Sequence, residues 1–310
     1  MCKKQCYMNS PVVVFVYNRP LHTQRTLAAL RSASNAANTS LIIFSDAAAD
    51  ARQQTAVDEV RRLCHSVQGF ASVEVVERAE NYGLARNIIE GVSQVFCNYP
   101  TAIVLEDDLV VGAGFIDYMN AALEFYCDRN VFSISGYTPE IRISDSYPSS
   151  TYLMHRNCSW GWATWRDRWQ SVDWQVADFD AFIRNSHLRR EFNRCGTDLS
   201  PMLLRWRMGE IHSWSIRFCY AAFRQGKPTV YPTASLVQNA GADGTGTNMR
   251  SSARYDTQLV QNVDLSRFAT DLTPDEQIVR EFRKKYNTSV IRLIINTLKR
   301  WHYILIGHKE

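Results

Sequence analysis

The sequence predicts an α/β fold with a mostly parallel sheet flanked by helices. Over its first three-quarters, short apolar runs of strand length alternate with segments of helical periodicity. Strands alternating with helices of about ten or more residues imply crossover connections, which place helices on both faces of a parallel sheet. Apolar residues make up 45% and charged residues 21% of the 310, as in ordinary globular proteins, so disorder, collagen-like repeats and a coiled coil are excluded.

Each predicted strand is a run of branched and aromatic residues, and each predicted helix has apolar residues three or four positions apart. The strands are expected at 12–17, 41–44, 73–76, 102–105, 131–135 and 230–231. Pro20 is expected to open the first helix, with Asn18 as its cap, and further helices are expected at 51–66, 83–99, 115–126, 201–225 and 290–306. From about Ile141 the sequence is irregular and rich in tryptophan.

Three consecutive acids, Glu106, Asp107 and Asp108, follow the predicted strand 102–105. Adjacent carboxylates repel one another and lose hydration when buried, so a divalent cation is the economical explanation for them. Mg²⁺ and Mn²⁺ accept carboxylate oxygen and commonly use one or two protein carboxylates beside substrate phosphates. A solvated acidic turn is the alternative. Ligands of parallel sheets bind beyond the carboxyl ends of the strands, which favours the metal site.

Other polar residues follow neighbouring strands. Asp46 comes after 41–44 and could accept hydrogen bonds from a base or ribose, or cap a helix. Arg19 follows the first strand, and Arg86 lies at the start of the helix 83–99, where the helix dipole also favours anions. Taken alone, either arginine would be an ordinary surface residue.

Charge and cysteine content exclude further classes. Residues 1–281 hold 28 Lys and Arg against 30 Asp and Glu, whereas residues 282–310 carry a net charge of +6. A nucleic-acid-binding protein would spread its basic residues over a docking face, so this class is disfavoured. The eight cysteines form no CxxC pair and are expected to be reduced and structural, with a disulfide framework as the alternative.

The order of these motifs resembles a known family. The segments 12–20 (VVVFVYNRP), 44–46 (FSD), 81–87 (NYGLARN) and 103–108 (IVLEDD) are similar to those of GT-A glycosyltransferases. They particularly resemble bacterial sugar transferases with an EDD version of the DxD motif and, more distantly, animal N-acetylglucosaminyltransferase I. The resemblance spans roughly residues 11–248.

This resemblance implies a GT-A fold, a nucleotide-diphosphate sugar donor (a UDP-sugar is favoured) and Mn²⁺ or Mg²⁺. It implies that Asp108 contacts the metal, and that Glu106 and Asp107 contact water, the ribose or the donor sugar. It further implies nucleotide-sugar contacts from Tyr17, Asn18, Arg19, Asp46, Asn81 and Arg86, and a place beside the donor sugar and acceptor for Trp160, Gly161 and Trp162. Core packing is the alternative for the tryptophans. The glycine-rich stretch 241–248 resembles a loop that could close on the donor, or it is a solvent loop.

Relatives with this triplet are mostly inverting, so the resemblance implies direct displacement with a catalytic base. The base of related chains lies just before a Trp at the start of a helix, which corresponds here to 209–214 (GEIHSW). This sequence has no Asp there. Glu210 is the first candidate and His212 the second, although Glu210 could be an ordinary first-turn acid and His212 a satisfied polar residue.

The expected domain organisation is an N-terminal tail (1–10), a catalytic domain (11–248) and a C-terminal segment (249–310). The catalytic domain would divide into a nucleotide-binding half (11–137) and an acceptor half (138–248). The last segment contains a basic amphipathic helix, 288–306, that could lie on an anionic membrane or pack on the body. Without a recognisable export signal, a cytoplasmic location is expected, with the inner membrane face as a peripheral site.

The leading hypothesis is a metal-dependent, inverting glycosyltransferase of bacterial surface-polysaccharide synthesis that transfers a hexosyl or N-acetylhexosaminyl group to a glycan or lipid-linked acceptor. A sugar nucleotidyltransferase is the second, although the turn after the first strand lacks the expected glycine-rich loop. A carbohydrate-binding protein is the third.

Overall fold

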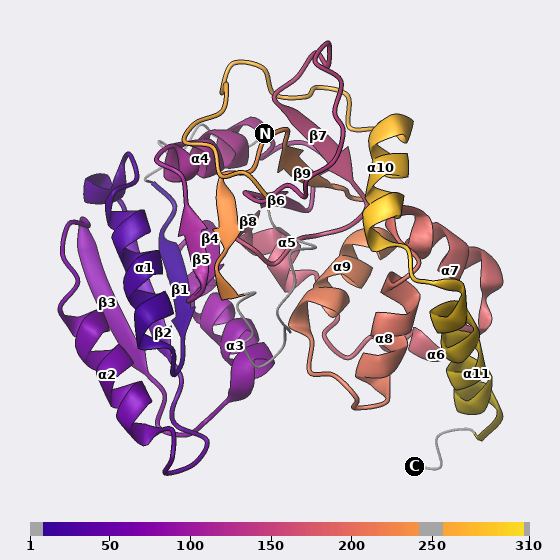
Figure 1. Cartoon of the computed structure of the whole chain (residues 1–310), viewed down its shortest axis with the longest axis horizontal. Helices are drawn as coiled ribbons and strands as arrows, with labels where there is room; N and C mark the ends of the chain where they lie inside the picture. The colour runs from indigo at the N-terminus through magenta and orange to yellow at the C-terminus, as the bar shows by residue number, and fades with distance from the viewer. Residues whose placement is uncertain (1–8, 242–256, 307–310) are drawn as a thin grey trace.

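The computed structural model describes residues 9–241 and 257–306, and Figure 1 shows how their helices and strands are arranged. The strands are β1 (Val12–Val16), β2 (Ser40–Ser45), β3 (Ser72–Glu77), β4 (Thr101–Glu106), β5 (Leu109–Val111), β6 (Ser133–Ser135), β7 (Thr151–Met154), β8 (Trp162–Trp165), β9 (Thr229–Pro232) and β10 (Val237–Asn239). The helices are α1 (Pro20–Arg31), α2 (Gln54–His65), α3 (Gly83–Asn98), α4 (Phe115–Phe125), α5 (Arg166–Gln170), α6 (Phe179–Arg184), α7 (Ser186–Phe192), α8 (Leu199–Arg207), α9 (Trp214–Arg224), α10 (Glu276–Tyr286) and α11 (Val290–Ile306).

The central sheet has the strand order β3-β2-β1-β4-β8-β6-β9-β7. The pairs β2–β3, β1–β2, β1–β4 and β6–β9 are parallel, whereas β8 is antiparallel to both β4 and β6 and β7 is antiparallel to β9. A small second sheet pairs β5 with β10. The predicted fold class, a mostly parallel sheet flanked by helices, is confirmed.

Both faces of the sheet are buried, as the unbroken apolar run of β1 requires. Val12, Val14 and Val16 pack into one core cluster with Leu27 and Leu30 of α1. Val13 and Phe15, which point the other way, pack with Ile88 and Val92 of α3. This alternation places α1 on one face and α3 on the other. The parallel pairing of β1 with β4 brings the carboxyl ends of these two strands together.

Several sequence expectations need correction. Arg19, not Asn18, occupies the cap position of α1, and no side chain caps that helix. The single helix expected at 201–225 is two helices, α8 and α9, because the chain breaks at Gly209, whose φ is +72°. The irregular, tryptophan-rich region contains β8, an inner strand of the sheet.

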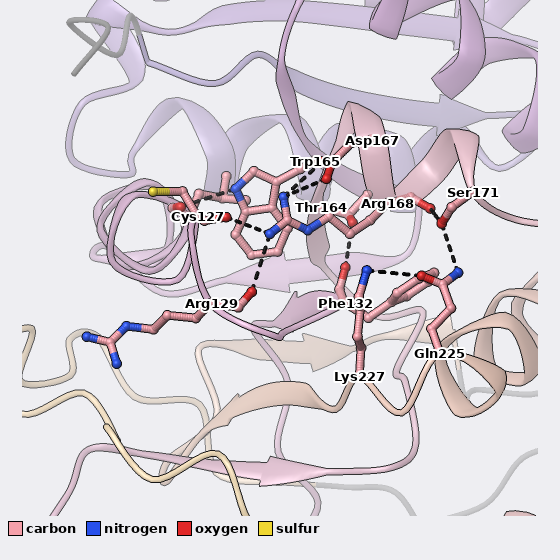
Figure 2. A network of polar contacts seen from close by, with 11 residues as sticks. Cys127, Arg129, Phe132, Thr164, Trp165, Asp167, Arg168, Ser171, Gln225 and Lys227 are labelled. Atoms are coloured by element: carbon pink, nitrogen blue, oxygen red, sulfur yellow. Dashed lines mark hydrogen bonds and ion pairs between the residues drawn. The ribbon is translucent and has the colours of Figure 1, made fainter. Parts of the chain in front are cut away.

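Figure 2 shows the polar contacts that hold β8 and α5 in place. The Arg168 guanidinium donates to the carbonyl oxygen of Cys127 at 2.5 Å, pairs with Asp167 and lies 4.4 Å over the Trp165 ring. Thr164 donates to the carbonyl oxygen of Phe132 at 2.7 Å. These bonds fix β8 next to β4, the strand in which the acidic triplet begins.

After residue 256 the chain returns over α4. Gly114 N donates to the Gln261 carbonyl oxygen at 2.6 Å, and the Phe268 ring packs 5.9 Å from Tyr126. The C-terminal helices α10 and α11 lie beside α7 and α8, at the opposite end of the molecule from β3 (Figure 1). Within residues 9–241 and 257–306, no helix combines the length and apolar character needed to cross a membrane.

Candidate active site

The acidic triplet lies where the central sheet ends. Glu106 is the last residue of β4 and pairs in register with Phe15 of β1. The backbone N–H of Tyr17, just beyond β1, donates to Asp107 Oδ2 at 3.1 Å, and the Thr26 hydroxyl of α1 donates to the Asp107 carbonyl oxygen at 2.9 Å. Strand β1 and helix α1 therefore position the triplet at the carboxyl end of the strands, as its sequence position predicts.

Asp108 forms an ion pair with Arg19, with Oδ2 2.9 Å from Nη1. The two side chains are only 20% and 14% exposed, so water screens the pair weakly. Arg19 Nη2 also lies 2.9 Å from His22 Nε2. His22 is not among the residues selected from the sequence, although its position three residues after Arg19, across the first turn of α1, was a usable signal.

Within residues 9–241 and 257–306, the Arg19 guanidinium does not by itself balance the three carboxylates. Burial, followed by repulsion from Asp108 and Asp107, raises the pKa of Glu106 well above its usual range. Burial and then Asp108 raise the pKa of Asp107 to about 7. Burial also raises the pKa of Asp108, although Arg19 opposes that shift. The corner thus has an excess of buried negative charge that an additional cation would stabilise.

Gly241 closes this corner from the other side. Strand β10 pairs with β5, and Ala240 N donates to the Asp108 carbonyl oxygen at 2.8 Å. A Cβ on Gly241 would lie 2.0 Å from Asp108 Oδ2 and 3.0 Å from Arg19 Nη1. Any larger residue at position 241 would therefore displace this carboxylate or the chain beside it. The rest of the predicted glycine-rich loop, 242–248, lies outside the described residues.

The donor set in this corner suits a hard divalent cation that also binds substrate. Among the residues that the structure describes, no group of three or more His, Cys, Asp or Glu side chains is arranged to hold a metal ion. A site that supplies one or two carboxylates and leaves the other positions to phosphate and water needs no such group. Asp108, with the space preserved by Gly241, fits that kind of site.

Asp46 caps α3, one of the two roles left open by the sequence. Its Oδ1 accepts from Tyr82 N at 2.8 Å, and its Oδ2 accepts from Gly83 N at 2.9 Å. Asn81 donates to the Ala47 carbonyl oxygen at 2.6 Å. Asp46 and Asn81 therefore order the turn that leads into α3.

The remaining candidates from the nucleotide-binding half have local partners. The Tyr17 hydroxyl accepts from Ala49 N at 3.0 Å and donates to Gln53. Asn18 lies partly buried in the bend between β1 and α1. Arg86 is exposed, pairs with Glu80 and Glu90, and lies 3.7 Å over the Tyr82 ring, so none of these contacts reaches the triplet.

The two tryptophans assigned to the pocket have different surroundings. Trp162 is 2% exposed, with its ring 4.9 Å from Trp214 and 5.7 Å from Trp169. The expectation that Trp162 lines the pocket is wrong, because its position in β8 directs the ring into the core. Trp160 is partly buried and meets the Tyr137 ring edge-on at 4.7 Å.

Gly161, between these tryptophans, has a φ of +61°, and a Cβ there would lie 2.8 Å from Val237 Cγ2. The glycine is needed for this close packing against β10. A ligand is not required to explain it.

We expect Trp162→Ala to destabilise the protein by about 3 to 5 kcal/mol, because it removes a buried ring from a cluster of aromatic side chains. Trp160→Ala is the matched control and should cost markedly less, since its ring is only partly buried. Urea unfolding followed by circular dichroism measures both. Equal losses for the two variants would contradict the assignment of Trp162 to the core.

The candidate bases lie in the turn between α8 and α9. Lys299 Nζ of α11 lies 2.7 Å from both carboxylate oxygens of Glu210, and Arg205 Nε lies 3.4 Å from Oε2. Lys299 and then Arg205 lower the pKa of Glu210. A lowered pKa makes a weaker proton acceptor, so Glu210 is not activated in this state. His212 is exposed in the same turn.

Solved structures similar to this chain include a mannosyltransferase and two further proteins. The mannosyltransferase PcManGT from Pyrobaculum calidifontis, in complex with GDP-Man and Mn²⁺, is 13% identical over 68% of this chain and 69% of its own, with a TM-score of 0.41. GalNAc-T7 with UDP, GalNAc and Mn²⁺ is 11% identical over 76% and 44%, with a TM-score of 0.46. TarS of S. aureus is 10% identical over 53% and 30%, with a TM-score of 0.36. This chain thus spans less than half the length of the latter two.

A family model described as the GNT-I family matches residues 1–200, which include the whole acidic corner except Gly241. The match covers well over half of the sequence, and the protein therefore belongs to the GNT-I family, a family of glycosyltransferases.

Proposed function

We propose that the protein is a metal-dependent, inverting glycosyltransferase with a nucleotide-diphosphate sugar as its donor, UDP-sugars being favoured. One observation carries this proposal. Asp108 is held at the carboxyl edge of the sheet by Arg19, next to Gly241, where a Cβ would lie 2.0 Å from Asp108 Oδ2. A buried carboxylate with an adjacent guanidinium can bind a cation and a diphosphate side by side.

Asp108 would hold Mn²⁺ or Mg²⁺ in this corner. When bound, the ion supplies positive charge that stabilises the departing nucleoside diphosphate. Arg19 would then donate to a phosphate oxygen in place of Asp108. Asp107 is fixed by the Tyr17 N–H and would keep the turn after β1 in register, while Glu106 would face water, ribose or the donor sugar.

The nucleoside is proposed to lie along the ends of β1 and β2, near Tyr17 and Asn18 and the turn ordered by Asp46 and Asn81. Arg86 could reach it only after leaving Glu80 and Glu90. Trp160 and Gly161 remain the proposed neighbours of the donor sugar.

Hydrolysis of UDP-, GDP- and dTDP-sugars without acceptor, with and without Mn²⁺, tests this function. We expect slow, Mn²⁺-dependent release of the nucleoside diphosphate from one class of donor. Release of pyrophosphate from a sugar phosphate and a nucleoside triphosphate would instead identify a nucleotidyltransferase. Sugar binding without any turnover would identify a carbohydrate-binding protein.

Glu210 is the proposed catalytic base, with His212 as the second candidate. Since Lys299 now pairs with Glu210, acceptor binding would have to loosen that pair before the carboxylate could take a hydroxyl proton.

We expect Glu210→Gln to lower transfer by roughly 100-fold or more, with donor binding unchanged, because general-base catalysis is worth about that much. Steady-state transfer and a nucleotide-binding titration measure the two effects. Lys299→Met is the companion variant. It removes the cation that lowers the Glu210 pKa, so the acid limb of its rate profile should move to higher pH. Full turnover in Glu210→Gln would transfer the role to His212.

The biological setting belongs to the same proposal. We propose a role in bacterial surface-polysaccharide synthesis on a glycan or lipid-linked acceptor, at the inner face of the cell membrane, with α11 as the membrane contact. The division into 1–10, 11–248 and 249–310 is also proposed, with residues 257–272 packed against the catalytic domain.

A further inference from the structure

The C-terminal helix α11 is held to the protein by its polar side. Its one buried side chain, Tyr303, donates to Asp180 Oδ1 at 2.9 Å and meets the Phe179 ring edge-on at 5.5 Å. One turn earlier, Lys299 pairs with Glu210. Helices on the surface of a globular protein ordinarily bury their apolar stripe, so α11 is packed in the reverse sense.

The apolar stripe of α11 faces away from the protein. Its members follow one another at intervals of three or four residues, which places them on one side of a helix. Their exposed fractions are 73% for Ile291, 57% for Ile294, 63% for Leu298, 52% for Trp301 and 77% for Leu305. Lys299 and Tyr303 lie on the opposite side. A contiguous exposed stripe of this kind marks an interaction surface.

An arginine-lined pocket lies next to the start of this helix. It has a volume of about 490 Å³ and is lined by Arg190, Glu191, Asn193, Arg194, Thr197 and Arg283. Arg194 pairs with Glu276, and Glu191 is the single acid in the lining. The pocket therefore carries a surplus of positive charge, and arginines arranged around a cavity are suited to phosphate.

The pocket adjoins the segment that leads into α11. The Thr197 hydroxyl accepts from Thr288 N at 2.8 Å, and Thr288 is two residues before α11 begins. Burial, followed by the positive charge of Arg300 on α11, lowers the pKa of Arg189, which is next to Arg190 on α7. Basic side chains thus lie both around the pocket and on the polar side of α11.

We propose that this surface binds an anionic phospholipid bilayer, with the apolar stripe of α11 in the interface and a headgroup phosphate in the arginine-lined pocket. The proposal deepens the membrane contact proposed above and rests on it. Basic groups beside Trp and aliphatic side chains are the composition of interfacial helices. A second copy of the chain is the poorer occupant, because a contact between two apolar stripes would leave the positive charge of the pocket without a partner.

Vesicle flotation with the full chain tests this assignment, using phosphatidylcholine alone and phosphatidylcholine mixed with phosphatidylglycerol. We expect binding to the mixed vesicles only, weakened by added salt. The double variant Arg190→Ala/Arg283→Ala should lower the partition coefficient roughly 30-fold, since each basic group near an anionic surface contributes about fivefold. Arg25→Ala/Arg62→Ala, with the same change of charge on α1 and α2, should bind like wild type.

Leu298→Glu tests the stripe separately and should lower partitioning roughly 10-fold or more. Its matched control is Leu21→Glu, on α1, where the leucine is 67% exposed against 63% for Leu298. Wild-type binding by Leu298→Glu, or by the double arginine variant, would overturn the proposal.

Two further outcomes would also overturn it. The first combines two results: the wild-type protein does not bind vesicles, and in sedimentation velocity without lipid it forms a concentration-dependent dimer. In that case Leu298→Glu would abolish the dimer. The second is binding of glycerol phosphate in solution by a protein that does not bind vesicles, which would assign the pocket to a soluble phosphate. Donor hydrolysis is measured in parallel without vesicles. It reports on the proposed catalytic function alone, so a failure of that function can be told apart from a failure of membrane binding.

Discussion

Asp108→Asn is expected to abolish sugar transfer, with a loss of roughly 1,000-fold or more. The amide has no negative charge, and losing the hold on a catalytic cation removes several kcal/mol of transition-state stabilisation. Electron paramagnetic resonance of Mn²⁺ should show that the variant no longer binds the ion in the presence of nucleoside diphosphate. Steady-state transfer measures the loss of rate.

The fold should survive this substitution. The amide side chain at position 108 would lose the ion pair with Arg19, but it would also relieve the repulsion that raises the pKa of Glu106. These effects oppose each other, so we expect a small change in melting temperature. Asp58→Asn, at an exposed position of α2, controls for the chemical change and should keep full activity. Mn²⁺ binding and turnover at the wild-type level in Asp108→Asn would remove the basis of the proposed mechanism.

Gly241→Ala is expected to lower transfer roughly 100-fold, because a displacement of about 1 Å in a catalytic group costs that much. The new methyl group would lie 2.0 Å from Asp108 Oδ2 and 2.7 Å from its Cγ, so the carboxylate has to move. Loss of Mn²⁺ affinity should accompany the loss of rate, and a titration with Mn²⁺ in the presence of nucleoside diphosphate measures it.

Gly226→Ala provides the comparison for this variant. Gly226 has a φ of +62°, and a Cβ there would meet no atom within 4 Å, so its substitution strains the backbone without a steric clash. We expect this variant to lose some stability and to keep its Mn²⁺ affinity. If both alanine variants bind Mn²⁺ equally well, the space beside Asp108 has no role in metal binding.

The strands that position the triplet could be predicted because their signal is local. An unbroken run such as Val12–Val16 marks a buried parallel strand, and acids directly after Leu105 must emerge at its carboxyl end. The antiparallel strands were missed for a different reason. Strand β10 pairs with β5 more than 120 positions earlier in the sequence, and no local pattern records such a partner.

The remaining differences between the sequence predictions and the structure come from side-chain direction and from contacts with residues far away in the sequence. Trp162 and Trp160 are chemically identical, but Trp162 lies in β8 with its ring in the core, whereas Trp160 precedes the strand, on the other side of Gly161 and its positive φ. The partner of Glu210 lies 89 residues away on α11, so its ion pair with Lys299 could not be deduced from the turn 209–213. By contrast, the capping role of Asp46 was among the alternatives that the sequence offered.

The Lys299–Glu210 pair ties the turn that carries the proposed base to a helix whose outer side faces away from the protein. If α11 lies in a lipid surface, this pair holds the turn 209–213 at a fixed distance from that surface. The distance between the turn and the backbone of α11 is about the length of one lysine side chain. Acceptors whose reactive hydroxyl is tethered close to their lipid anchor would meet the turn directly. Long glycans would have to fold back toward the lipid to be extended.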